Sequence, residues 1–211
     1  MTAVRVALFS SGTGTNFEAI ADAAREGDLG AEIVALVCDR PDAAVIGKAH
    51  ARGIKTILVP VKTGQSRASH EEEILEQLLP LQPKFGVLAG YMRVLTPTFL
   101  QAFDSKRGYF RVTNIHPSLL PAFPGVNAYT QAFNSGVKIS GCTVHWVDQG
   151  VDSGPVCAQE AFTISDCKSV TEVRARGLAV EHRLYPESLK WMIQEKFLLE
   201  KREGRLCVLP N

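Results

Sequence analysis

The first 89 residues alternate short apolar runs with segments of helical periodicity, and this alternation constrains the fold more than any other feature. Apolar runs of strand length lie at Val4–Phe9, Ala31–Cys38, Thr56–Val59 and Phe85–Ala89. Helical spacing of apolar residues occurs in Phe17–Arg25, Asp42–Arg52 and Ser66–Leu79. Such alternation is typical of βαβ units, which place their sites at the carboxyl ends of parallel strands. We therefore predict an α/β fold with a mostly parallel central sheet and flanking helices.

Beyond Asn114 the pattern changes to longer strands. Ile139–Val147 and Val156–Thr163 predict two later antiparallel strands joined by the turn sequence DQGVDSG. Helical spacing then extends over Ser169–Glu195, where Pro186 should kink the helix or mark its boundary. The last segment, FLLEKREGRLCVLP, predicts a hairpin that turns at Glu203-Gly204.

Composition excludes several classes of protein. The formal net charge of +1 gives no reason to expect nucleic acid or an anionic membrane as a partner. No apolar run is long enough to span a bilayer, and MTAVRVALFSSG reads as a first strand rather than a signal peptide. The five cysteines show no metal-ligand spacing, which predicts free thiols without zinc or disulfides. The predicted location is cytoplasmic.

The segment SSGTGTN, which ends at Asn16, lies directly between the first strand and the first helix. Its two glycines let backbone N–H groups approach an anion, and the helix N-terminus adds partial positive charge. Thr15 or Asn16 is the expected N-cap. The loop therefore predicts a phosphate site, with a tight turn lacking a ligand as the alternative. Phe17 replaces the third glycine of a dinucleotide loop, although Asp39 could mimic the acid that binds a ribose.

The stretch NIHPSLLPAFPG begins with an asparagine and a histidine two residues apart and then carries three prolines. On a strand, side chains alternate, so Asn114 and His116 project together while Ile115 points into the core. An amide donor beside an imidazole suits the stabilisation of an oxyanion and the transfer of a proton at a carbonyl centre. The prolines would restrict the loop and keep the pair in place. A structural histidine bonded to backbone is the alternative.

A carboxylate beside His116 would favour its imidazolium form. The turn between the two later strands offers Asp148 and Asp152, and the residue pattern does not choose between them. Either aspartate could instead bond only to its own turn. For His145, on the preceding strand, a structural hydrogen bond is the favoured interpretation.

Five segments, in this order and spacing, resemble the phosphoribosylglycinamide formyltransferase family: SSGTGTN, LAGYMRVL, NIHPSLLPAFPG, GCTVHWVDQGVDSGPV and VEHRLYP. The likeness runs from about Val4 to about Pro186. It implies a Rossmann-like formyltransferase fold and a single formyltransferase domain over residues 1–211. Within that domain, residues of about 1–110 would form the phosphate-binding half and about 111–211 the catalytic and folate-binding half. The implied reaction is formyl transfer from 10-formyltetrahydrofolate to 5'-phosphoribosylglycinamide in de novo purine biosynthesis, without a metal.

The resemblance also assigns roles to individual residues. The implied catalytic residues are Asn114, His116 and Asp152. The implied ribotide-binding residues are Gly14, Thr15, Asn16 and Glu181. The implied folate-binding residues are Arg67, Met92, Arg93, Val94, Leu95, Asn114 and Asp148. The expected partners are small-molecule substrates, and the expected assembly is a monomer or homodimer.

Three alternatives remain open at this point. A formyltetrahydrofolate hydrolase or another formyltransferase of the same superfamily would share the core motifs. A nicotinamide-dependent oxidoreductase would use the glycine loop and Asp39, and a non-catalytic protein could bind a ligand on the same fold.

We also predict that His50 and His70 are solvated and that the basic run SKRGYFRVT forms an altered surface loop.

Overall fold

The computed structural model describes residues 3–210 and divides them into two compact units. The first unit ends at Thr113 and the second begins at Asn114, close to the predicted division near residue 110. The assignment of the whole chain to one domain remains a prediction.

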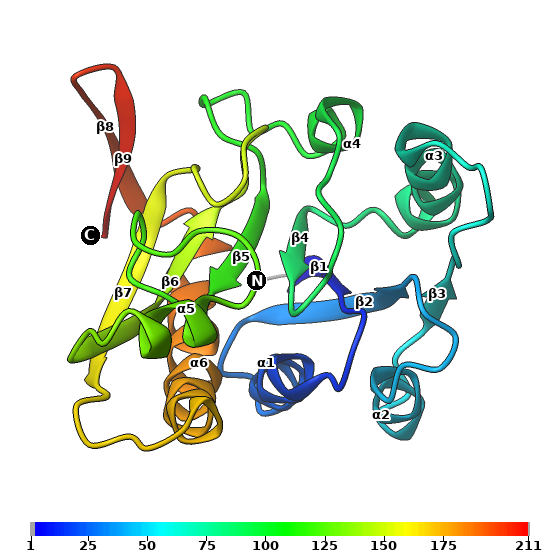
Figure 1. Ribbon diagram of the computed structural model, residues 1–211. Helices are drawn as coiled ribbons and strands as arrows, with labels where there is room; N and C mark the ends of the chain where they lie inside the picture. Colours follow the sequence, from blue (N-terminus) through cyan, green and yellow to red (C-terminus); the bar gives the residue numbers. More distant parts are fainter. Residues whose placement is uncertain (1–2, 211) are drawn as a thin grey trace. The chain divides into compact units, whose positions relative to one another are not determined.

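The first unit is built on a parallel sheet (Figure 1). Its strands are β1 (Val4–Phe9), β2 (Ala31–Cys38), β3 (Thr56–Leu58) and β4 (Phe85–Leu88). Strand β1 lies between β2 and β4, and β3 pairs with the outer side of β2. Phe9 faces both Val37 and Leu88, so the carboxyl ends of three strands meet at one edge of the sheet.

Helices cover both faces of this sheet. Figure 1 shows α1 (Thr15–Arg25) and α2 (Val45–Ala51) on one face, with α3 (Arg67–Leu78) and α4 (Pro97–Gln101) on the other. A 3-10 turn, η1 (Leu79–Leu81), extends α3. The helix predicted at 42–52 begins at Val45, because Ala43 N donates to Arg40 O in a turn that precedes the helix. Helix α4 was not predicted, since five residues are too few to display a periodicity.

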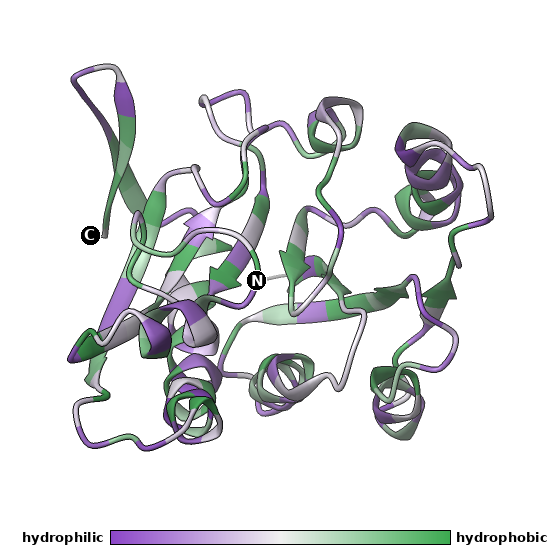
Figure 2. Ribbon diagram, viewed as in Figure 1, coloured by the Kyte–Doolittle hydropathy of each residue, from purple (hydrophilic) through white to green (hydrophobic). Residues whose placement is uncertain are grey.

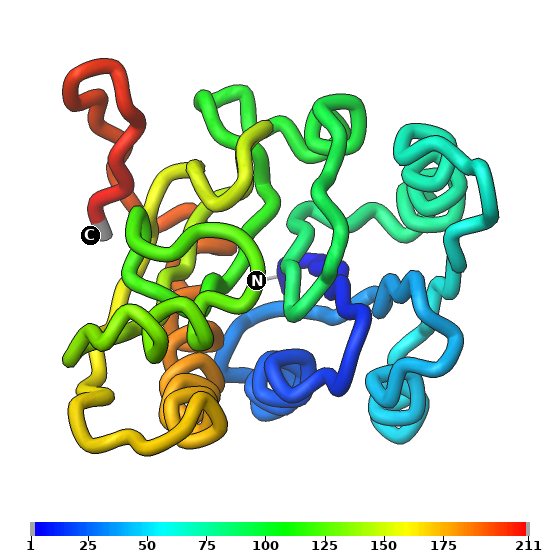
Figure 3. The backbone as a smooth tube through the Cα atoms, viewed as in Figure 1, coloured from blue at the N-terminus to red at the C-terminus, as the bar shows by residue number. Residues whose placement is uncertain are grey.

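The second unit contains the antiparallel strands. Strand β5 (Val112–His116) crosses from the first unit, and β6 (Ile139–Trp146) pairs antiparallel with β7 (Val156–Thr163). Strands β8 (Phe197–Arg202) and β9 (Arg205–Pro210) form the predicted hairpin, which the tube in Figure 3 shows as the last turn of the chain. The predicted α/β class, with a parallel first half and later antiparallel strands, is confirmed.

Two helices complete the second unit. They are α5 (Ala128–Asn134), which the sequence analysis missed, and α6 (Val170–Met192). Pro186 lies inside α6, which excludes the predicted helix boundary, while the alternative that it kinks the helix stays a prediction. Colouring by hydropathy shows strands that are mostly apolar and helices with mixed faces (Figure 2). The apolar sides of α5 and α6 meet in a cluster that includes Tyr129 and Val173.

The prediction that His70 is solvated is wrong. Its side chain is buried, and its Nε2 lies 2.8 Å from the carbonyl oxygen of Val59. Its polar neighbours along the sequence gave no sign that this position of α3 packs against the sheet. His50 is exposed, as predicted.

Candidate active site

The second unit places His116 against Asp152. The Nδ1 atom of His116, at the end of β5, lies 3.1 Å from Oδ2 of Asp152, in the turn after β6. Both side chains are nearly buried, with exposed fractions of 4% and 11%. The structure thereby brings together two residues that are separated in the sequence by helix α5 and strand β6.

The other ring nitrogen of His116 also faces an acceptor. Nε2 lies 2.8 Å from the carbonyl oxygen of Phe123, in the proline-rich loop. The imidazolium form of the ring donates from both nitrogens and so satisfies both acceptors. Phe123 itself has a positive φ of 52°, a conformation that non-glycine residues seldom adopt. The alternative prediction of a histidine bonded to backbone therefore holds for Nε2, whereas Nδ1 faces the Asp152 carboxylate.

Asn114 reaches the same cluster through His145. Its Nδ2 lies 3.4 Å from Nε2 of His145, and that Nε2 is 3.7 Å from Oδ1 of Asp152. His145 Nδ1 lies 3.0 Å from the carbonyl oxygen of Trp146 and must therefore carry the proton in the neutral ring. Nε2 then accepts a hydrogen bond from the Asn114 amide. The favoured interpretation of His145 as a structural hydrogen bond is supported, but its partners also belong to the site.

Burial controls the charge of His145. Burial lowers the pKa of this ring below its ordinary value, although the Trp146 carbonyl and the Asp152 carboxylate act in the opposite direction. The ring sits where the β6–β7 register shifts, between Val144 and His145. Register shifts of this kind redirect side chains next to functional sites.

The two candidate aspartates have different surroundings. Asp148 Oδ1 accepts hydrogen bonds from the backbone of Gly150 and the hydroxyl of Ser153, so it bonds within its own turn. Asp152 Oδ2 faces His116 and also accepts the backbone N–H of Gly125 at 2.7 Å. Contact with His116 therefore distinguishes Asp152 from Asp148.

The glycine loop in the first unit depends on Gly14. Gly14 has φ 74° and is the N-cap of α1, with no side-chain cap, so the prediction that Thr15 or Asn16 caps this helix is wrong. Gly14 adopts the left-handed conformation, and the helix begins immediately after it. A Cβ added to Gly14 would lie 2.5 Å from Cγ2 of Val45. Phe17, in place of a third glycine, is fully buried in the core.

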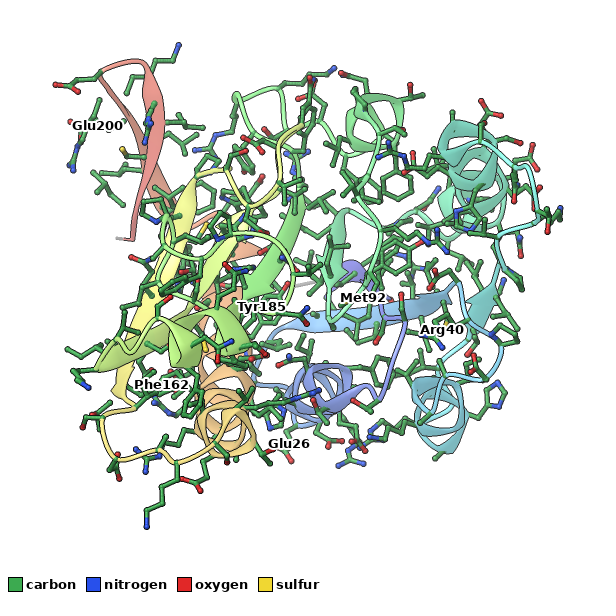
Figure 4. The ribbon with its side chains drawn as sticks, viewed as in Figure 1. Glu26, Arg40, Met92, Phe162, Tyr185 and Glu200 are labelled. Carbon is green, nitrogen blue, oxygen red and sulfur yellow. The ribbon has the colours of Figure 1, made fainter. Side chains whose placement is uncertain are left out.

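The residues implied for folate in the first unit differ in exposure. Arg67 is exposed at the first position of α3, after the N-cap Ser66. Met92 and Val94 are 72% and 46% exposed, and Figure 4 labels Met92 in the loop that follows β4. Leu95 is buried. This loop therefore presents apolar side chains to solvent close to the edge where the glycine loop begins.

Glu181 lies in a separate cluster of the second unit. Tyr129, on α5, donates its hydroxyl to Oε1 of Glu181, on α6, at 2.5 Å. The thiol of Cys142 lies 3.5 Å from the same hydroxyl. Burial raises the pKa of Tyr129 far above its usual value, and the Glu181 carboxylate adds to this effect. Sequence reasoning missed Tyr129, because it lies on a short helix whose contact with Glu181 spans 52 residues.

The described residues, 3–210, contain no group of three or more histidine, cysteine, aspartate or glutamate side chains arranged to hold a metal ion. No helix in this range has the length and apolar character needed to cross a membrane. Asp39 is buried and paired with Arg93, an environment that does not suit the ribose contact of a dinucleotide site.

Residues 4–189 match the family model described as formyl transferase. The chain therefore belongs to the formyl transferase family, an enzyme class consistent with an amide, an imidazole and a carboxylate gathered at a strand end.

Individual relatives show which kind of formyl transferase the chain resembles. Phosphoribosylglycinamide formyltransferase of Bacillus subtilis is 42% identical over 90% of this chain and 94% of its own. Glycinamide ribonucleotide transformylase 1 of Symbiobacterium toebii is 36% identical, with a TM-score of 0.91 over 100% of this chain and 95% of its own. The enzyme of the same name from Geobacillus kaustophilus is 45% identical, with a TM-score of 0.85 over 90% and 99%. The predicted resemblance to phosphoribosylglycinamide formyltransferases is confirmed.

Proposed function

We propose that this chain transfers the formyl group of 10-formyltetrahydrofolate to the amine of 5'-phosphoribosylglycinamide. The observation that carries the proposal is the His116–Asp152 ion pair, which lies beside Asn114 on the same strand end. The family and its relatives support formyl transfer in purine biosynthesis. The site supplies an amide donor and an imidazole beside a carboxylate, which are groups suited to acyl transfer to an amine.

In the proposed mechanism, the ribotide amine attacks the formyl carbon directly. A carbon–nitrogen bond forms, and the formyl oxygen gains negative charge in a tetrahedral intermediate. Asn114 Nδ2 and the His116 imidazolium stabilise that oxygen. The bond between the formyl carbon and N10 of the folate then breaks, and the proton lost by the amine passes to N10. No covalent enzyme intermediate is needed.

Asp152 holds His116 in its charged form and helps to relay the proton. Its second oxygen lies toward His145, whose neutral ring orients the Asn114 amide. Nε2 of His116 faces the carbonyl of Phe123. In the proposed mechanism the formyl oxygen takes the place of this carbonyl as the acceptor of the Nε2–H hydrogen bond.

The remaining implied residues bind the two substrates in this proposal. The loop of Gly14, Thr15 and Asn16 takes the ribotide phosphate at the N-terminus of α1, and Glu181 accepts hydrogen bonds from the ribose hydroxyls. Arg67, the segment Met92–Leu95 and the turn at Asp148 bind the folate. We propose small molecules as the only substrates, a cytoplasmic location, and a monomer or homodimer.

A spectrophotometric assay tests the function. Purified protein is mixed with 10-formyltetrahydrofolate or its dideaza analogue, with and without glycinamide ribonucleotide, and release of the deformylated folate is followed. Release that depends on the ribotide is expected. Release without it would instead identify a formyltetrahydrofolate hydrolase, and absence of release in both mixtures would overturn the proposal.

A further inference from the structure

Asp39 is a buried carboxylate that the proposed mechanism does not use. It follows β2 directly, and its side chain is only 2% exposed. Arg93 Nε, in the loop after β4, donates to Asp39 Oδ2 at 2.7 Å. A buried carboxylate with a charge-assisted partner fixes the position of that partner more firmly than a surface pair does.

Ser11 joins the same network from the start of the glycine loop. Its hydroxyl hydrogen-bonds to the Asp39 carboxylate, and its Oγ accepts the backbone N–H of Met92 at 3.1 Å. Its own backbone N–H donates to the carbonyl of Gly90 at 3.0 Å. Ser11 therefore holds the loop after β4 at two backbone positions, while Asp39 holds the side chain of Arg93.

The loop after β4 exposes apolar side chains beside this network. Arg93 Nε donates to the buried acid while the Arg93 side chain stays 39% exposed, and its neighbours Met92 and Val94 are 72% and 46% exposed. A surface loop ordinarily exposes its charged residues and buries its apolar ones. This loop presents two exposed apolar side chains, which suit the face of a flat heteroaromatic ring.

We infer that Asp39 and Ser11 are positioning residues for the pterin end of the formyl-folate donor. By fixing the Arg93 guanidinium through its Nε and the backbone of Met92 through its N–H, they shape a surface that the donor binds. The inference rests on the proposed function, because it requires a folate substrate at this loop. It assigns a purpose to an ion pair whose members lie 54 residues apart.

The charge of Asp39 is consistent with this role. Burial alone would raise the pKa of the carboxyl, but the hydrogen bonds from Ser11 and Arg93 outweigh it and lower the pKa below its usual value. The carboxylate is therefore ionised at neutral pH and available to hold the guanidinium. The other ionisable groups close to it are Tyr91, whose own pKa burial raises, and Cys38, whose pKa burial also raises.

The test compares Asp39→Asn and Ser11→Ala with a matched control, Asp22→Asn. Asp22 also binds an arginine in the first unit, with both its oxygens 3.0 Å from Arg52 nitrogens, but it lies on the outer side of α1. KM for each substrate, kcat and the melting temperature are measured for the three variants. We expect KM for the folate to rise about tenfold in the first two variants, with KM for the ribotide within about twofold of wild type. The control should leave both KM values unchanged.

Two outcomes overturn the inference. In the first, both variants keep the wild-type KM for folate, whether or not their melting temperatures fall, which would make the network purely structural. In the second, KM for the folate and KM for the ribotide rise by the same factor in these variants, so that no effect is specific to the folate. If Asp39→Asn does not fold, Ser11→Ala decides the question, because it removes one hydroxyl and no charge. Failure of the proposed function is distinguishable, since wild-type protein would then show no folate release that depends on the ribotide.

Discussion

Asp152 Oδ2 lies 3.1 Å from Nδ1 of His116 and accepts the backbone N–H of Gly125 at 2.7 Å. One carboxylate oxygen thus connects the His116 imidazole to the proline-rich loop that follows it. Asp152 adopts a positive φ of 52° to make these contacts. Strained backbone of this kind persists where the surrounding contacts hold it, and it is common at functional sites.

Replacement of this carboxylate should impair catalysis more than binding. For Asp152→Asn we expect kcat to fall by about 100-fold or more, with modest changes in both KM values, because the neutral amide no longer holds an imidazolium. Steady-state kinetics with each substrate varied in turn measure the split. Asp166→Asn, which removes a surface carboxylate paired with Arg176, is the control and should retain its rate. Retained activity in Asp152→Asn would exclude the assigned role.

Gly14→Ala should weaken both the fold and ribotide binding. Its positive φ and the 2.5 Å approach of Val45 Cγ2 to an added Cβ predict a loss of about 1–3 kcal/mol in the free energy of unfolding. KM for the ribotide should rise because the loop carries the proposed phosphate site. Urea denaturation and kinetics measure the two effects. Gly12→Ala is the stability control, since an added Cβ there meets nothing within 4 Å. Equal stability of the two variants would contradict the strain argument.

Tyr129→Phe should affect the ribotide selectively. The variant removes the hydroxyl that donates to Glu181 at 2.5 Å and leaves the packing of the ring intact. A hydrogen bond to a buried charged group contributes about 1.5–3 kcal/mol, so we expect KM for the ribotide to rise about tenfold while KM for folate stays unchanged. Cys142→Ala provides a comparison. It removes the thiol that contacts the Tyr129 hydroxyl, but it leaves the hydrogen bond from Tyr129 to Glu181 in place. An unchanged ribotide KM in Tyr129→Phe would separate Glu181 from ribose binding.

The neutral state of His145 should make stability depend on pH. Its folded pKa is depressed, mainly by burial, below the value of about 6.5 expected in the unfolded chain. Near this pH the folded protein binds fewer protons than the unfolded chain does. The stability that goes with a neutral His145 is therefore fully present above about pH 6.5. It is lost as pH falls toward the folded pKa, at up to about 1.4 kcal/mol per pH unit.

Thermal unfolding between pH 5 and pH 8 tests this sign. The melting temperature of the wild type should fall on acidification below about pH 6.5. His145→Gln should show a shallower fall, because it removes the titrating ring. If the melting temperatures of the wild type and His145→Gln fell in parallel with pH, other groups would be responsible for the loss of stability in acid.

Local sequence signals predicted much of the fold. The bounds of β1, β2 and β7 were predicted to the residue, because runs rich in apolar and β-branched residues that end at turn signals mark strands directly. The two short helices α4 and α5 were missed, since five and seven residues hold too few turns to show a period. The N-cap of α1 was misassigned because a left-handed glycine gives no side-chain signal.

The sequence by itself determined the α/β class, the strand and hairpin positions, and the family, because periodicity and ordered motifs are properties of neighbouring residues. Only the tertiary structure decided which groups meet. It paired Asp39 with Arg93, joined Tyr129 to Glu181, and buried His70, whereas the choice of Asp152 over Asp148 as the partner of His116 was already implied by the family resemblance. These contacts join residues between 11 and 54 positions apart. Their formation depends on how strands and helices pack, which no local pattern encodes.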